Sequence, residues 1–263
     1  MFVACSHIGL QWVALLLALI MSFTVLTTYL ISIYRGHVNA ELPFIRQVYT
    51  YSSTGAYPPE SCIFGEGLNI AAFISLICSF CWYLIALERT KFMGTHQPNC
   101  LLKFMLVLSL IASIGLTLVG NFQQVNVELV HDIGAGMAFF GTTLYITLCA
   151  LVSKRYLGTH WCIWAFRLVL GIMAAITSSL FSVCHTISRI NFNGTQEESL
   201  TYRHPGQGGF SFYLCSTSFE WAAGFIIIVF FTTWAYEFRS YAFQLPQVVK
   251  KHPFESDIYS LKS

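Results

Sequence analysis

Charged residues make up only 10% of this 263-residue chain, and several ionisable or amide side chains lie inside or at the edges of long apolar stretches. Glu220 stands inside the last stretch, about eight residues or roughly 12 Å along a helix axis from its start. A charged side chain near the middle of a bilayer costs roughly 2.5–3.5 kcal/mol on insertion scales, so an intramembrane carboxylate marks a candidate site. The other candidates, nearer the ends of such stretches, are Asn69, Asn121, His131, Asp132 and His185.

These side chains could serve three kinds of chemistry. Hydrogen bonds between helices would hold a bundle together, because polar side chains join membrane helices. A cluster open to one side of the membrane could bind a lipid headgroup or a small ligand. Imidazole and carboxylate groups could also bind zinc or catalyse a reaction, but no HExxH motif or other close ligand spacing supports that. We therefore expect no catalytic residue, no metal and no cofactor.

The elements that would position these residues are membrane-spanning helices. Only 10% of the residues are charged and 56% are hydrophobic, whereas soluble domains are about 25% charged. About 20 apolar residues cross the hydrocarbon core as a helix, and lipid offers no partner for a free backbone N–H. The stretches that qualify are 11–34, 67–87, 103–122, 133–153, 163–187 and 212–236. We predict an all-α, polytopic membrane protein: a six-transmembrane-helix bundle over residues 1–240 and a short cytoplasmic tail at 241–263.

The placement of charges orients this bundle. The loops near 88–102 and 154–162 carry Lys and Arg, as does the tail, whereas the loop around 123–132 carries neither. Basic loops favour the cytoplasm, so both termini are predicted to be cytoplasmic. Asn193-Gly194-Thr195 is a glycosylation pattern, usable only on the lumenal or extracellular side, and it falls in a loop that the charges already place outside. The candidate polar residues then all lie in the outer half of the membrane.

The first apolar stretch has an alternative interpretation as a cleaved signal peptide. It lacks a preceding basic segment, its apolar run is too long, and no clear small-x-small site follows. We therefore interpret it as a membrane helix.

Three cysteines fall at or near the outer side, where disulfides form: Cys62, Cys184 and Cys215. Three thiols allow at most one internal bridge. A bond between Cys184 and Cys215 would tie the outer ends of the last two helices, and Cys62 with either of them is the alternative.

Two further features concern packing. Arg167 lies near the inner end of the fifth stretch, and its long stem favours an extended side chain that reaches the headgroups rather than a buried partner. Gly134, Ala138 and Thr142 recur at four-residue spacing, which is typical of a close helix–helix contact.

Short blocks along nearly the whole chain resemble one family of membrane proteins. In order, they are Tyr57-Pro58-Pro59-Glu60-Ser61-Cys62, then Phe64 and Asn69-Ile70-Ala71-Ala72-Phe73, Gly120-Asn121-Phe122-Gln123 before His131, Glu220-Trp221, and Tyr236-Glu237-Phe238-Arg239. They are similar to the DRAM group, the damage-regulated autophagy modulators and their modulator-of-macroautophagy relatives. This group belongs to the FRAG/DRAM/SFK superfamily, which includes proteins with a Cwh-type N-terminal domain. The resemblance implies six helices and a role in autophagy or phosphoinositide signalling at the lysosome or plasma membrane.

The resulting prediction is a multi-pass glycoprotein of the lysosomal, endosomal or plasma membrane that modulates autophagy or lipid signalling without being an enzyme. Its expected partners are membrane lipids and other membrane or autophagy proteins. Nucleic acid is excluded because no basic run or aromatic-basic segment is present. One alternative is a lipid-remodelling enzyme or accessory factor of the GPI-anchor type, with an outer-half polar site. The other is a channel component.

Overall fold

Six long helices make up most of the computed structural model, which describes residues 8–37, 52–94, 98–194 and 206–243. All six are long and apolar enough to cross a membrane, and each predicted span corresponds to one of them, so the predicted fold class is confirmed. The helices are α1 (Gln11–Arg35), α2 (Glu60–Phe92), α3 (Asn99–Asn121), α4 (Glu128–Tyr156), α5 (Trp161–Ile190) and α7 (Phe210–Thr233).

Four short elements complete the described chain. A one-turn helix, α8 (Ala235–Phe238), follows α7 directly and completes the last predicted span. A 3-10 turn, η1 (Ser52–Gly55), precedes α2. Two-residue strands stand at the described chain ends, β1 (Ile8–Gly9) and β2 (Ala242–Phe243). From residue 244 on, the predicted tail lies outside the described residues.

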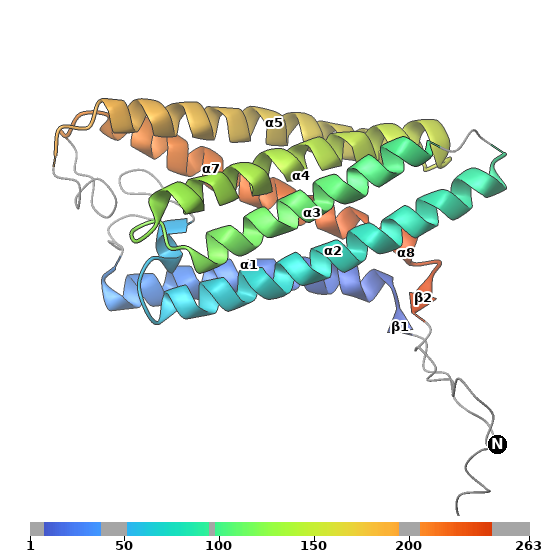
Figure 1. The fold of residues 1–263 in the computed structure, drawn as a ribbon, viewed down its shortest axis with the longest axis horizontal. Coiled ribbons are helices and arrows are strands. Elements are labelled where there is room, and N and C mark those ends of the chain that lie inside the picture. Colours follow the sequence, from blue (N-terminus) through green and yellow to red (C-terminus); the bar gives the residue numbers. More distant parts are fainter. Residues whose placement is uncertain (1–7, 38–51, 95–97, 195–205, 244–263) are drawn as a thin grey trace, which may run out of the picture.

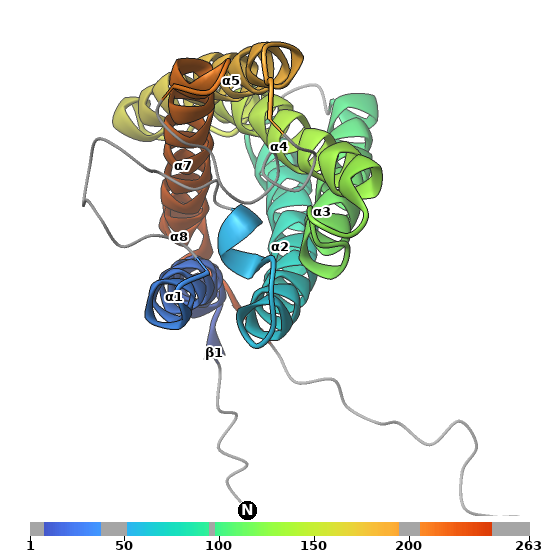
Figure 2. The same ribbon diagram turned by 90° about the vertical axis from the view of Figure 1, so that its left-hand side faces the viewer.

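The long helices form a closed ring when the bundle is viewed along its axis (Figure 2). Each helix from α1 to α5 contacts the next, α5 contacts α7, and α7 returns to α1. The ring closes partly through an edge-to-face contact between Tyr29 on α1 and Trp221 on α7, whose ring centroids are 5.7 Å apart. Because the ring is closed, side chains from most of the helices meet along its axis.

The bundle has two different ends (Figure 1). At what we call the terminal end, β1 pairs antiparallel with β2, with Ile8 opposite Phe243, and the α2–α3 and α4–α5 connections also lie here. At the other end, which we call the loop end, lie η1 and the connections that follow α3 and α5. The two described chain ends therefore lie on the same side of the bundle, as an even number of spans requires.

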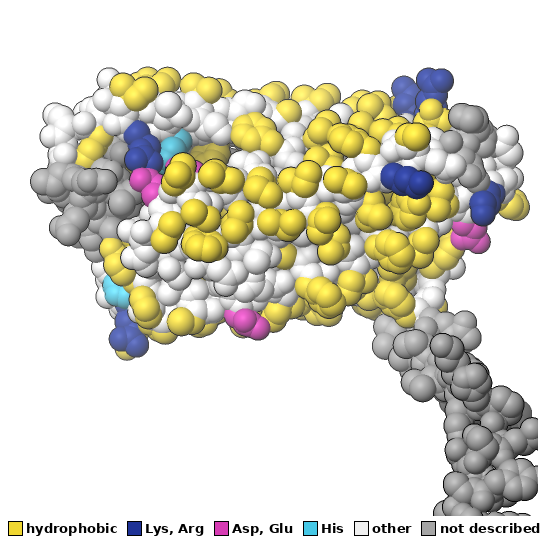
Figure 3. Space-filling view, in the orientation of Figure 1, with side chains coloured by type: hydrophobic (Ala, Val, Ile, Leu, Met, Phe, Trp, Pro, Cys, Tyr) yellow, Lys and Arg dark blue, Asp and Glu magenta, His cyan; other side chains and the backbone are white. Residues whose placement is uncertain are grey.

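The exterior is largely apolar. Figure 3 shows hydrophobic side chains across the middle of the visible face, with most charged side chains close to the two ends. This belt suits a lipid environment, where every backbone polar group is satisfied inside a helix.

Glycines allow α3 and α4 to pack closely. A Cβ atom on Gly115 would lie 2.6 Å from the carbonyl oxygen of Gly134 and 2.6 Å from the backbone nitrogen of Ala138. The small-residue face predicted on α4 therefore does pack against α3 at Gly134 and Ala138. Thr142, the third member of that face, lines an internal cavity, as Ala138 also does.

Candidate functional site

A small cavity near the loop end gathers four of the six candidate residues. It has a volume of about 10 Å³, which is roughly the space of one water molecule. We call it the polar cavity. Its lining comprises His131, Asp132 and Ala135 from α4, Phe181 and His185 from α5, Glu220 from α7, and Gln124 from the α3–α4 connection. Side chains from α4, α5 and α7 thus converge on one point.

His131 is fixed in orientation by the end of the neighbouring helix. Its side chain is buried, and its Nδ1 lies 2.7 Å from the carbonyl oxygen of Phe122, just after α3. A carbonyl only accepts hydrogen bonds, so Nδ1 is the protonated nitrogen and Nε2 is left as an acceptor in the neutral ring.

Glu220 occupies the junction between the polar cavity and a second, longer cavity. Its side chain is only 3% exposed, and it lines both cavities together with His131 and Ala135. A buried carboxylate is tolerated when it is protonated or finds hydrogen-bond donors and positive charge. Glu220 therefore places a polar group where the polar cavity meets the longer, largely apolar cavity.

Ion pairs border the polar cavity on its outer side. Arg189, in the last turn of α5, pairs through both Nη atoms with Glu128 in the first turn of α4, with 3.0 Å between Nη2 and Oε2. Arg189 Nη1 also lies 3.8 Å from Oδ2 of Asp132, which has His185 as another electrostatic neighbour. Two carboxylates thus share one partly exposed guanidinium.

Asn69 and Asn121 lie elsewhere and bind each other. Asn121 Nδ2 donates to Asn69 Oδ1 at 2.8 Å and to the carbonyl oxygen of Thr117 at 2.7 Å, and Asn69 Nδ2 donates back to Asn121 Oδ1 at 3.2 Å. The pair joins α2 to α3. The structure therefore brings Glu220, His131, Asp132 and His185 together and places Asn69 and Asn121 in a separate interhelical contact.

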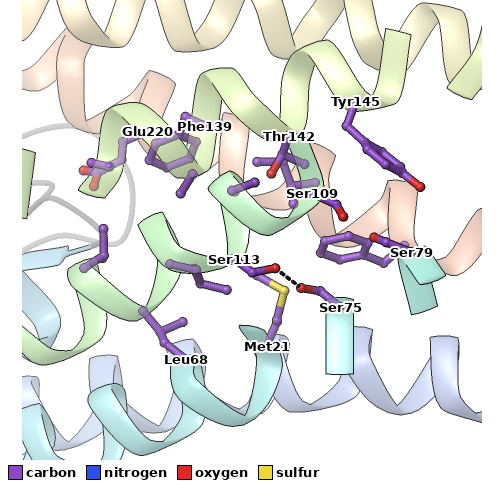
Figure 4. A pocket seen from close by; sticks show the side chains of 18 of the residues that line it. Met21, Leu68, Ser75, Ser79, Ser109, Ser113, Phe139, Thr142, Tyr145 and Glu220 are labelled. Carbon is purple, nitrogen blue, oxygen red and sulfur yellow. Dashed lines mark hydrogen bonds between the residues drawn. The ribbon is translucent and has the colours of Figure 1, made fainter. Parts of the chain in front are cut away.

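A longer cavity extends from Glu220 and His131 toward the terminal end (Figure 4). Its volume is about 70 Å³, and we call it the central cavity. Side chains from α1, α2, α3, α4 and α7 line it. Most are apolar, and the hydroxyl-bearing lining residues other than Tyr145 are Ser75, Ser79, Ser109, Ser113 and Thr142.

Several of these hydroxyls are already satisfied within the bundle. Ser75 donates to the carbonyl oxygen of Ala72 and lies 3.1 Å from Ser113 across α2 and α3. Ser109 donates to the carbonyl oxygen of Leu106. Sequence reasoning missed these residues because single Ser and Thr residues in apolar helices commonly bond to their own backbone, and only the fold shows that they face one axis.

Arg167, expected to reach the headgroups, is instead fully buried at the terminal end. Its Nη1 and Nη2 donate to Oε1 and Oε2 of Glu237 at 2.7 and 2.6 Å. Nη1 also donates to Ser153 Oγ at 2.9 Å, while Nε and Nη2 donate to Oγ1 and the carbonyl oxygen of Thr233, each at 2.9 Å. The expectation was wrong because Ser153, Thr233 and Glu237 supply acceptors for the guanidinium inside the bundle, which hydropathy alone does not reveal.

The remaining candidates stay predictions. Cys62, Cys184 and Cys215 are free thiols in the structure. Cys184 and Cys215 lie on contacting helices and are electrostatic neighbours. Asn193 lies at the loop end, where its Oδ1 accepts a hydrogen bond from the backbone nitrogen of Gly208 at 3.0 Å; the third residue of its glycosylation pattern lies outside the described residues. Across the described ranges, no group of three or more His, Cys, Asp or Glu residues could hold a metal ion.

Comparisons with known proteins identify the relatives of this chain. Residues 9–241 match the family model described as the Frag1/DRAM/Sfk1/Cwh43P N-terminal domain. The chain is 28% identical to mouse (Mus musculus) DNA damage-regulated autophagy modulator protein 1 over 238 residues, which cover 90% of this chain and 94% of that protein.

The alignments with two other relatives cover a smaller share of each chain. Mouse DNA damage-regulated autophagy modulator protein 2 is 28% identical over 222 residues, covering 82% of this chain and 79% of that protein. Transmembrane protein 150A of Xenopus laevis is 30% identical over 191 residues, covering 72% of this chain and 61% of that protein. No solved structure is detectably similar. Because the family match runs from β1 to the end of the described bundle, the chain belongs to the Frag1/DRAM/Sfk1/Cwh43 family.

Proposed function

We propose that this protein is a non-enzymatic modulator of autophagy that acts within the lysosomal, endosomal or plasma membrane. The observation that carries the proposal is the match, over most of both chains, to proteins named as autophagy modulators. Membrane lipids are its immediate partners, since the apolar belt of the bundle faces them.

Two features of the polar cavity support a role without catalysis. The described lining contains no Ser or Cys that could act as a nucleophile. His131 Nδ1 donates to a backbone carbonyl, and in nucleophilic catalysis its other ring nitrogen would need such a nucleophile within hydrogen-bond reach.

The orientation that we propose places the terminal end in the cytoplasm. Arg89 and Lys91 end α2, and Lys154 and Arg155 end α4, all at the terminal end. At the loop end, Arg189 is paired with Glu128. The excess of basic residues at the terminal end is typical of a cytoplasmic face, so the polar cavity opens toward the lumen or the extracellular side.

Cells that lack the protein test this function. A tagged copy is localised against lysosomal and plasma-membrane markers, and autophagic flux is measured in fed and starved cells with a fluorescent autophagosome reporter that is quenched in lysosomes. We expect altered flux that re-expression restores. Unchanged flux in both conditions would rule the proposal out.

A second candidate is an accessory factor in lipid remodelling, which the continuity between the polar and central cavities favours. Analysis of lipids and GPI-anchor lipids in the same cells distinguishes the two candidates. A changed anchor-lipid composition with normal flux would favour the second.

A further inference from the structure

We propose that the terminal end of the bundle binds anionic phospholipids through exposed cations beside the α2–α3 and α4–α5 connections. We call this region the basic surface and define it by Lys91, Lys103, Lys154 and Arg155. Its ligands are negatively charged phospholipid headgroups in the leaflet that surrounds this end of the bundle. The surface goes beyond the proposed role in autophagy and does not depend on it.

The four cations lie at the ends of neighbouring helices. Lys91 is in the last turn of α2, Lys103 lies about one turn into α3, and Lys154 and Arg155 are in the last turn of α4. Helix α3 contacts both α2 and α4. The α2–α3 and α4–α5 connections both lie at the terminal end (Figure 1), and Figure 3 shows Lys and Arg side chains gathered there.

The two connections also touch each other. A Cβ atom on Gly158, in the α4–α5 connection, would lie 3.2 Å from Cε of Met93. Met93 directly follows α2. The basic ends of α2 and α4 therefore belong to one continuous surface.

This surface carries a positive charge that the described chain does not neutralise. All four cations are exposed, and none takes part in an ion pair among the described residues. The described acidic residues at this end are Glu88 and Glu237. Glu237 is buried against Arg167, and Glu88 shares the Tyr241 hydroxyl with Arg89. An anionic partner is therefore complementary to the surface.

The loop end is different. Its described basic residues are Arg35, in the last turn of α1, and Arg189. Arg189 is paired with Glu128 and lies near Asp132. A cluster of unpaired cations is thus a property of the terminal end, and the loop end offers a natural control.

Exposed aromatic side chains beside the cations favour a lipid partner. Phe92 is 90% exposed, Trp161 65% and Phe104 50%, and aromatic residues at the ends of membrane helices lie at the level of the headgroups. Nζ of Lys154 lies 4.6 Å from the centre of the Trp164 ring. This contact positions the ammonium group and leaves its N–H donors for a phosphate oxygen. An acidic protein would have to cover aromatic side chains that the membrane already covers.

Quenching of tryptophan fluorescence by brominated lipids tests the proposal. The purified full chain is reconstituted into phosphatidylcholine bilayers that contain increasing amounts of phosphatidylserine with brominated chains, which quench on contact. We expect phosphatidylserine to be preferred over brominated phosphatidylcholine at least about fivefold, the factor that one basic residue contributes at an anionic surface. High salt should bring the preference close to one, because exposed charges are screened.

Matched variants locate the surface. Arg155→Gln should lower the preference at least about twofold, whereas Arg35→Gln, the same change in the last turn of α1 at the loop end, should leave it unchanged. Lys154→Gln combined with Arg155→Gln should remove most of it. If size-exclusion chromatography shows that this double variant does not fold, Lys91→Gln with Lys103→Gln replaces it, with the same expected direction.

Soluble competitors separate the sources of negative charge. Glycerophosphoserine, the headgroup without its chains, should not displace the lipid, because it is not anchored beside the aromatic side chains. Equal binding of the two lipids, a preference that high salt leaves unchanged, or equal losses for Arg35→Gln and Arg155→Gln would overturn the proposal. Displacement of the lipid by glycerophosphoserine would indicate a site for a free anion, and displacement by soluble polyglutamate a site for an acidic protein; either result would overturn it as well.

Discussion

The buried Arg167–Glu237 pair gives the sharpest test of the fold. Both side chains are fully buried, and the guanidinium makes five hydrogen bonds, two of them to the carboxylate. Glu237→Gln keeps the shape of the side chain but removes its charge and one of the two acceptors. Breaking a buried ion pair by changing one partner costs about 3–5 kcal/mol, because the other charge is left uncompensated.

The size of this effect also follows from the separate bonds. A hydrogen bond to a charged group contributes about 1.5–3 kcal/mol, and two such bonds join Arg167 to Glu237. Reversible unfolding in mixed micelles, followed by tryptophan fluorescence, measures the free energy of unfolding for the original protein, Glu237→Gln and Arg167→Met.

A matched control and a double variant make the interpretation specific. Arg189→Met removes a guanidinium whose side chain is 38% exposed and which also pairs with a carboxylate, so it should cost less than about 1 kcal/mol. Arg167→Met combined with Glu237→Leu should cost less than either single change, because no buried charge is left unpaired. A loss for Glu237→Gln no larger than that for Arg189→Met would refute the reasoning.

Three other predictions concern packing, cross-linking and topology. Gly134→Ala should lower the free energy of unfolding by about 1–3 kcal/mol through overpacking, since its Cβ would lie 2.7 Å from the Cβ of Leu118. Gly136→Ala, whose Cβ would have nothing within 4 Å, should be neutral or stabilising. Equal effects of the two substitutions would contradict the α3–α4 contact. Mild oxidation should join Cys184 to Cys215, as seen by a mobility shift on non-reducing gels, and stabilise the protein by about 2–4 kcal/mol; labelling of both thiols after oxidation would exclude the bridge. Asn193→Gln should abolish the shift in gel mobility that glycosidase treatment produces. Tags at both ends should be cleaved by protease in sealed vesicles whose cytoplasmic face points outward, and a protected tag would contradict the predicted topology.

The helices could be predicted well because the information for them is local. An uncharged stretch such as 11–34 has to be helical in lipid whatever surrounds it, and it corresponds to α1. The helix ends were less accessible to prediction. Helix α2 begins at Glu60, seven residues before the expected span, because Glu60 is buried against Ser32 and His37 at the loop end.

The candidate site could be predicted only in part, because it depends on which helices become neighbours. Depth along the helices placed Glu220, His131 and His185 in the same half of the bundle, and the ring brings them to one cavity. Depth alone also grouped Asn121 with them, but its position on α3 turns it toward Asn69 on α2. Rotation about each helix axis is set by tertiary packing, and a single sequence does not specify it.

The two buried polar clusters differ in their surroundings. At the terminal end, every N–H of Arg167 has an acceptor, and such a completed network rigidifies the elements that it joins. Near the loop end, His131, Asp132, His185 and Glu220 instead line a small cavity. The Arg167 network therefore ties together α4, α5, α7 and α8. Glu237→Gln should accordingly lower the free energy of unfolding, because it leaves the buried charge of Arg167 uncompensated at the point where these helices meet.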